Sequence, residues 1–194
     1  MKTILASASP RRQELLSQLI PIFETYPCNV EELHDAEIAS ELMVQKNAYR
    51  KAMYAFSKLS YMPMLIISAD TIVRTSKGML LGKPQNHEQA VDFLQSLSGK
   101  PHLVISGVAI ILKNKTHQFL ELFSETSELV FHTLSTSSIE SYVTTFKPFD
   151  KAGAYGIQEL PQGFLKSLKG SMNNVIGLPT ETLRSVLSKY ITCT

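Results

Sequence analysis

The sequence has few cysteines, almost no excess charge and no long apolar run. Its 2 cysteines, Cys28 and Cys193, lie far apart without metal-ligand spacing, which excludes a disulfide framework and a zinc site and favours a reduced compartment. The net charge of 19 − 17 = +2 argues against a broad basic face that would bind DNA or RNA. The apolar stretch over 103–112 is far shorter than the roughly 20 residues that cross a bilayer. We therefore expect a cytoplasmic protein with neither a stable nucleic-acid complex nor a membrane association.

Familiar catalytic signatures are also missing. The sequence contains no phosphate-binding G-x-x-x-x-G-K-[ST] loop, no G-x-G-x-x-G turn and no G-x-S-x-G elbow. Its 5 histidines are scattered without an i, i+4 pair, and His102, on a predicted strand, is more typical of a structural histidine than of a metal ligand. These absences exclude a P-loop NTPase, a zinc hydrolase and a serine hydrolase.

The length and the hydrophobic pattern indicate a globular α/β protein. A chain of 194 residues with 44% hydrophobic content fits one domain over 1–194, or two lobes that share a cleft. Apolar periodicity predicts strands over 2–6, 64–68, 103–112, 119–131 and 163–168, a hairpin over 71–81, and helices over 10–19, 36–57, 86–97, 137–145 and 179–190. Capping-box spacing at Asn86 with Gln89 and at Ser137 with Glu140 supports the starts of two of these helices. This irregular alternation, with hairpins between the helices, is typical of a mixed central sheet flanked by helices.

The first candidate site lies at the start of the first predicted helix. Ser9 is the expected N-cap and Pro10 the first helical residue, so Arg11 and Arg12 fall in the first turn. Cations are unfavourable there, because unpaired N–H groups already make this end of a helix positive. A bound phosphate, with Ser7 nearby, would remove the mismatch. The alternative is a surface helix whose arginines point into water.

Carboxylates provide the second group of candidates. Asp70 follows an apolar strand, where it could hold a divalent cation or activate water, or could instead be a turn residue that accepts backbone hydrogen bonds. Glu31 and Glu32 precede the second predicted helix. They could supply another metal ligand, or form an acidic turn that favours the helix dipole.

Two further segments carry polar residues in turns. Lys83 lies between Gly82 and Pro84, where a fixed cation would suit a polyphosphate, although an exposed loop lysine is the simpler interpretation. In the segment 150–158, small residues would let the backbone approach a planar ligand, and the Gln158 amide could read the edge of a base; the alternative is a tight turn under an aromatic ring. Lys51, in mid-helix, reads as part of a solvated face.

Taken together, these segments resemble the Maf family of nucleotide pyrophosphatases. The resemblance runs in the family's order from residue 4 to about residue 187 and rests on six segments, 7–16, 69–73, 82–84, 97–99, 150–158 and 174–179. It implies an elongated, two-lobed α/β fold with a central cleft, related to the inosine-triphosphate pyrophosphatases. It also implies hydrolysis of a nucleoside triphosphate to the monophosphate and pyrophosphate, a house-cleaning reaction that needs Mg²⁺ or Mn²⁺. Dimers are common in the family, so a homodimer is part of the expectation.

The resemblance implies a role for each candidate residue. Asp70 matches the proposed general base, and Glu32 aligns with an acidic residue, so that both are candidate metal ligands and the choice between base and ligand stays open for Asp70. The remaining matches are residues tied to substrate choice, Arg11, Thr71 and Gln158, and residues on the phosphate side, Ser7, Arg12, Lys51 and Lys83.

Gln158 resembles the branch of the family that acts on dTTP and UTP, since the branch acting on 7-methyl-GTP usually has a glutamate there. A neutral amide can donate to and accept from a pyrimidine edge, whereas a carboxylate only accepts. The turn that follows, over 159–163, departs from the family pattern, as does Met172 in place of an aromatic residue. Two alternatives therefore remain: the same reaction on a purine or modified triphosphate, and a nucleotide- or nucleic-acid-binding regulator of cell division with little turnover.

Overall fold

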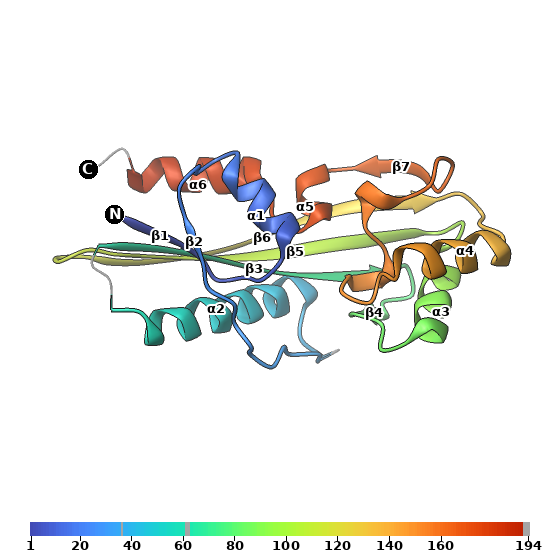
Figure 1. The fold of residues 1–194 in the computed structure, drawn as a ribbon, viewed down its shortest axis with the longest axis horizontal. Coiled ribbons are helices and arrows are strands. Elements are labelled where there is room, and N and C mark those ends of the chain that lie inside the picture. The colour runs from blue at the N-terminus through green and yellow to red at the C-terminus, as the bar shows by residue number, and fades with distance from the viewer. Residues whose placement is uncertain (36, 61–62, 192–194) are drawn as a thin grey trace. The chain divides into compact units, whose positions relative to one another are not determined.

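The computed structural model describes residues 1–35, 37–60 and 63–191. In this part of the chain a mixed seven-stranded sheet has the order β2-β1-β3-β5-β6-β7, and β4 pairs with β3 (Figure 1). The strands are β1 Lys2–Leu5, β2 Glu24–Thr25, β3 Met64–Thr75, β4 Leu80–Leu81, β5 Pro101–Lys113, β6 Gln118–Phe131 and β7 Leu165–Lys169. The helices are α1 Pro10–Ser17, α2 Ser40–Lys58, α3 His87–Leu97, α4 Thr136–Phe146, α5 Met172–Ile176 and α6 Thr180–Ile191, with short 3₁₀ turns η1 Ala152–Ala154 and η2 Ile157–Glu159.

Strand directions explain why the sheet is mixed. β1 runs parallel to both β2 and β3, with Ile4 opposite Ile66, whereas β4 pairs antiparallel with β3 and β7 antiparallel with β6. Helices are needed to connect the parallel strands, and tight turns suffice for the antiparallel ones. The predicted α/β class with a mixed central sheet is therefore confirmed.

The chain forms two compact units that share the long strands. Within the described residues, the first unit comprises 1–70, 106–125 and 177–194, and the second comprises 71–105 and 126–176. β3 passes from the first unit to the second between Asp70 and Thr71, and β5 and β6 also contribute to both. No helix within the described ranges is both long enough and apolar enough to cross a membrane.

The core of the first unit is built for close approach of α2 to the sheet. Ala48, Ala52 and Ala55 of α2 are buried against strand residues that include Ile66. Within this unit α2 covers one face of the sheet, and α1 and α6 cover the other (Figure 1). On β5, a Cβ atom at Gly107 would lie 2.4 Å from the carbonyl carbon of Val44. Glycine is thus required there, because any side chain would displace the backbone of α2.

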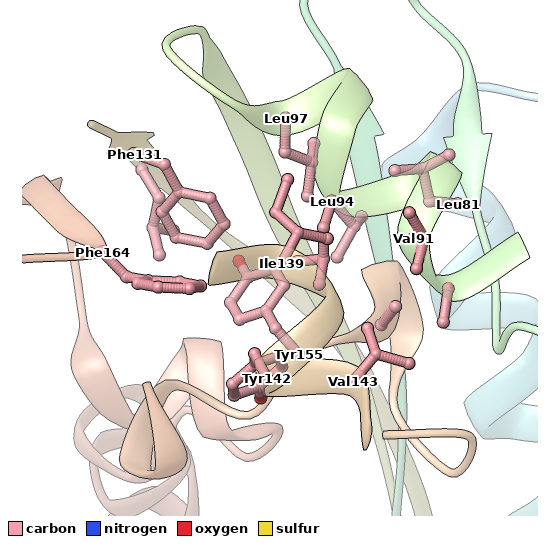
Figure 2. Close-up of a cluster of buried hydrophobic side chains, with 14 of the residues drawn as sticks. Leu81, Val91, Leu94, Leu97, Phe131, Ile139, Tyr142, Val143, Tyr155 and Phe164 are labelled. Atoms are coloured by element: carbon pink, nitrogen blue, oxygen red, sulfur yellow. The ribbon is translucent and has the colours of Figure 1, made fainter. Parts of the chain in front are cut away.

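The core of the second unit contains larger side chains than that of the first and is rich in aromatic residues. Phe131, Tyr142, Tyr155 and Phe164 gather with aliphatic residues of α3 and α4 (Figure 2). The rings of Phe131 and Tyr155 meet edge to face with centroids 5.0 Å apart, an arrangement that aromatic pairs prefer. His102 lies in the same cluster, with its ring centroid 4.8 Å from that of Phe131.

Most predicted elements are present, with shifted ends. The predicted helix over 36–57 begins at Ser40, and its predicted first residue, Ala36, lies outside the described residues. The predicted strand 64–68 and the first arm of the hairpin form one continuous strand, because apolar residues continue on both sides of Asp70. The capping pair assigned to Ser137 is wrong: Ser135 caps α4, and its Oγ accepts from the Ser138 N–H at 3.1 Å. The elements β2, η1, η2 and α5 were not predicted.

Candidate active site

Asp70 reaches its position through the alternation of side chains along β3. Met64 and Ile66 pack in the cluster that contains the alanines of α2, and the Ser68 hydroxyl donates to the Ala48 carbonyl of that helix at 2.6 Å. Because side chains alternate between the faces of a strand, Asp70 falls on the face that α2 covers. Asp70 has only 3% of its surface exposed to solvent. A carboxylate so deeply buried needs partners, since an unpaired charge in a protein interior is very costly.

Lys51 of α2 supplies the first partner and connects Asp70 with Glu32. The Lys51 Nζ lies 2.6 Å from Asp70 Oδ1 and 2.6 Å from Glu32 Oε1. Lys51 is buried, so it does not belong to a solvated helix face. The three groups together carry one net negative charge in their ionised forms. Two carboxylates that converge on one cation are a suitable arrangement for binding a divalent metal with phosphate oxygens.

Asn47 supplies the second partner of Asp70. Its Nδ2 donates to Asp70 Oδ2 at 2.9 Å and to the Leu33 carbonyl at 3.2 Å, while its Oδ1 accepts from the Leu33 N–H at 2.7 Å. No sequence motif pointed to this residue. The signal available was its spacing from Lys51: residues four apart share one face of a helix, and here two polar residues interrupt an apolar face.

Ser7 and Arg12 form a second polar group in the first unit. Ser9 caps α1 as predicted, with its Oγ accepting from the Arg12 N–H at 3.5 Å. The Arg12 guanidinium donates from Nε to the Gly177 carbonyl at 2.9 Å and from Nη1 to Ser7 Oγ at 3.4 Å. The pKa of Arg12 is lowered, chiefly by burial and to a smaller extent by the charge of Arg11. The charges of Asp70 and Glu32 oppose this shift and raise the pKa. Arg12 is thus electrostatically coupled to the carboxylate cluster.

The second unit holds Lys83 and Gln158 on segments that are hydrogen-bonded to each other. The Gly153 N–H donates to the Gly82 carbonyl at 3.0 Å, which joins the lysine turn to the segment before η2. Lys83 and Gln158 are both exposed. Gly153 has a φ of 69°, and a Cβ there would lie 2.8 Å from a methyl carbon of Val73. The positive φ and the close approach both require glycine.

A buried lysine supports the turn that carries Gln158. The Lys151 Nζ lies 2.9 Å from Asp150 Oδ1 and 3.2 Å from Glu159 Oε2. A Cβ at Gly156 would lie 2.9 Å from Lys151 Cε, so the absent side chain leaves space for the lysine stem. Glu159, at which the sequence first departs from the family pattern, directly follows Gln158 and is paired with Lys151.

The direct contacts divide the predicted site residues into groups. In the first unit they join Asp70, Glu32 and Lys51, and they join Ser7 with Arg12; Arg11 is in the first turn of α1. Thr71, Lys83 and Gln158 belong to the second unit, where Thr71 directly follows Asp70 on β3. Glu31 is exposed beside Glu32.

Metal-binding residues of other types are not gathered in the described ranges. No group of three or more histidine, cysteine, aspartate or glutamate residues could hold a metal ion there. Cys28 is a half-buried free thiol, and Cys193 lies outside the described residues. The carboxylates of Asp70 and Glu32, which share Lys51 as a partner, are the candidate pair, and two carboxylates suit Mg²⁺ that is completed by water and phosphate.

His102 is not part of this site. It is 1% exposed, and its Nε2 lies 2.9 Å from the Tyr155 hydroxyl. Burial lowers the pKa of His102 to about 4, and the Lys100 backbone raises it by a smaller amount. Burial also raises the pKa of the Tyr155 hydroxyl above its ordinary range. The expectation of a structural histidine agrees with this neutral, buried position.

Comparisons with known proteins agree with the motifs. The family model described as "Maf-like protein" matches residues 2–190. The chain is 43% identical to a dTTP/UTP pyrophosphatase of Clostridium beijerinckii, over 97% of this chain and 99% of that protein. It is 42% identical to a dTTP/UTP pyrophosphatase of Thermosipho africanus, over 96% of this chain and 92% of that protein. The solved structure of the Staphylococcus aureus Ham1 protein is similar in fold, with a TM-score of 0.55 and 12% identity over 97% of this chain and 99% of that one.

Proposed function

The chain belongs to the Maf-like protein family, and we propose that it is a nucleoside triphosphate pyrophosphatase that hydrolyses dTTP and UTP to the monophosphate and pyrophosphate. The reaction is hydrolysis of an acid anhydride. The observation that carries the proposal is the buried cluster in which Lys51 joins Asp70 and Glu32, in a chain about as long as relatives that bear this name.

The proposed chemistry is attack by water on the α-phosphorus. The new bond forms between the water oxygen and that phosphorus, the α–β bridging P–O bond breaks, and pyrophosphate leaves with the electron pair. Asp70 takes a proton from the water, which requires an ionised carboxylate held in a fixed orientation. Ser7, Arg11, Arg12, Lys51 and Lys83 stabilise the charge of the triphosphate, as positioned cations and donors do in phosphoryl transfer.

Asp70 and Glu32 are also the residues that would hold Mg²⁺ or Mn²⁺. One oxygen of each carboxylate lies 2.6 Å from Lys51 Nζ, so the two groups lie on either side of the same cation. Hard divalent cations prefer such oxygen ligands, and Mg²⁺ commonly takes one or two carboxylates with phosphate oxygens. A metal bound there would polarise a phosphate oxygen.

The pyrimidine preference rests on Gln158. Its exposed amide, on the turn supported by Lys151, offers both a donor and an acceptor to a base edge. Arg11 and Thr71 complete the proposed set that selects the substrate. The small-molecule nucleotide is the proposed partner, in the cytoplasm, with a homodimer as the proposed assembly.

A nucleotide panel tests this function. Pyrophosphate release is measured for dTTP, UTP, CTP, dATP, GTP and 7-methyl-GTP with Mg²⁺, with Mn²⁺ and with chelator. We expect the largest kcat/KM for dTTP and UTP, and loss of turnover with chelator. A purine preference would instead favour the altered turn over 159–163 as the specificity element, and saturable binding without turnover would show a regulator.

A further inference from the structure

We infer that Asn47 is a positioning residue that holds both carboxylates of the Lys51 cluster in their reactive arrangement. The inference rests on the proposed function, because positioning has a catalytic consequence only where the cluster hydrolyses a nucleotide. Asn47 acts through Asp70 and through the segment that carries Glu32. It is 1% exposed, and its polar atoms are engaged within the protein.

The first contact fixes the rotation of the Asp70 carboxylate. Lys51 binds Oδ1 at 2.6 Å, and the Asn47 amide donates to Oδ2 at 2.9 Å. One partner alone would leave the carboxylate able to turn about its terminal torsion, which is broad for aspartate. Partners on both oxygens define the plane of the group. Because the amide is neutral, it orients the carboxylate without changing the charge of the cluster.

The second contact fixes the segment that carries Glu32. The described residues 26–35 contain neither helix nor strand, so regular backbone pairing does not hold Glu32 in place. The Asn47 side chain exchanges two hydrogen bonds with the Leu33 backbone, at 2.7 and 3.2 Å. This amide–backbone pair reproduces the two-bond exchange of neighbouring strands. The backbone next to Glu32 is therefore anchored to α2.

The two contacts together make α2 the common support of the site. Asn47 and Lys51 are four residues apart and share one helix face. Asn47 binds Asp70 and the backbone of Leu33, and Lys51 binds Asp70 and Glu32. Asp70 and the segment that carries Glu32 are thus both supported by one helix, whose regular backbone defines positions more sharply than a loop could.

Ser68 offers a matched control for a merely structural role. Like Asn47, it is a buried polar residue that connects β3 with α2, since its hydroxyl donates to the Ala48 carbonyl at 2.6 Å. It lies two residues before Asp70 on the same strand, but its hydroxyl binds helix backbone and not a carboxylate. Ser68→Ala therefore removes a buried connection between the same two elements and leaves the carboxylate contacts intact.

The experiment compares Asn47→Leu and Ser68→Ala with the parent protein. Steady-state hydrolysis of dTTP gives kcat and KM, and hydrogen exchange gives the protection of the Leu33 amide. For Asn47→Leu, which keeps the side-chain volume and removes the hydrogen bonds, we expect kcat to fall roughly 10- to 100-fold with KM within about 3-fold. We also expect Leu33 exchange to accelerate by about 10-fold or more relative to the parent. Ser68→Ala is expected to keep kcat within about 2-fold of the parent and Leu33 exchange unchanged.

The outcomes separate the inference from the proposed function. A kcat of Asn47→Leu within about 2-fold of the parent overturns the positioning role, as does an equal loss in Ser68→Ala. If Asn47→Leu does not fold, Asn47→Ala replaces it, because it removes the amide and its hydrogen bonds without adding bulk or charge; the same kcat criterion applies. If the parent itself releases no pyrophosphate, the proposed function fails, and Leu33 exchange alone decides whether Asn47 anchors the segment.

Discussion

The two units bury polar side chains in opposite electrostatic states. In the first unit Lys51, Asp70 and Glu32 carry charges that neutralise one another in part at contacts of 2.6 Å. In the second unit the His102 and Tyr155 side chains meet at 2.9 Å inside an aromatic core, and burial shifts the pKa of each toward the neutral form. Oppositely charged side chains pair in the first unit, whereas burial among apolar rings disfavours the charged forms of His102 and Tyr155 in the second. The first arrangement suits chemistry on a charged substrate, and the second suits stability.

The largest expected effect comes from removing the charge of Asp70. Asp70→Asn keeps the shape of the side chain and its place beside Lys51, but it removes the proposed base. We expect kcat for dTTP to fall by about 10²- to 10⁴-fold, while nucleotide binding is largely retained. Pyrophosphate release and equilibrium nucleotide binding are the two measurements. Asp92→Asn, at an exposed position of α3, is the control, and full activity in Asp70→Asn would end the assignment.

Removing the shared cation is the next test of the comparison. Lys51→Met leaves Asp70 and Glu32 buried or half-buried without their common partner. We expect the free energy of unfolding to fall by roughly 3–5 kcal/mol, the usual result of breaking a buried ion pair from one side. Urea denaturation measures it, and Lys46→Met, an exposed site on the same helix, is the control. A decrease in the free energy of unfolding no larger than that of Lys46→Met would mean that Lys51 does not hold the carboxylates together.

The neutral cluster of the second unit predicts a specific pH dependence. The pKa of His102 is about 4 in the folded protein, against an ordinary value of 6.5 that applies to the unfolded chain. Between these values the unfolded chain binds the proton and the folded chain does not. The folded state therefore loses stability as the pH falls from 6.5 to about 4, by about 3 kcal/mol in total, and the contribution is fully present above pH 6.5.

His102→Gln should flatten that part of the stability profile, because glutamine does not titrate. Urea unfolding at several pH values between about 4 and 7 makes the comparison, and His132→Gln, at an exposed histidine of the same unit, is the control. An unchanged slope in His102→Gln would show that other groups dominate the acid response.

The smallest expected effect concerns the base. Gln158→Glu replaces a group that donates and accepts with one that only accepts, so the proposed pairing with a pyrimidine edge loses a donor. We expect kcat/KM for dTTP and UTP to fall about 10- to 100-fold, with no change in the free energy of unfolding because the side chain is exposed. Competition between dTTP and 7-methyl-GTP gives the ratio of their kcat/KM values directly. Equal kcat/KM in parent and variant would remove Gln158 from the specificity set.

Local sequence signals account for much of the fold. Ser9 and Asn86 act as N-caps where the spacing predicts them, since the capping bond involves only residues three apart. At α4 the same signal was ambiguous, because serines at 135, 137 and 138 offer competing caps, and the helix uses the first of them. The continuous strand through Asp70 was divided in the prediction because a buried aspartate reads as a strand end.

The candidate site was less accessible from the sequence. The burial of Lys51 follows from partners 19 residues away in either direction, Glu32 and Asp70, and no local pattern specifies that meeting. Asn47 was missed for the same reason: its hydrogen-bond partners are the backbone of Leu33, 14 residues before it, and the carboxylate of Asp70, 23 residues after it. Asp70 and Glu32 were candidates from their positions in the sequence, Lys51 became one through the resemblance to a family, and only the three-dimensional arrangement revealed Asn47 beside them.

Gly107 has a consequence for how this enzyme can vary. A Cβ there would lie 2.4 Å from the backbone of α2, at the helix that carries both Asn47 and Lys51. In a saturation library of β5, position 107 should therefore reject even alanine, and the surviving variants should lose turnover before they lose the fold. A residue with no side chain thereby sets how closely α2 approaches the sheet. A search for activity-altering positions that considers only polar residues would overlook it.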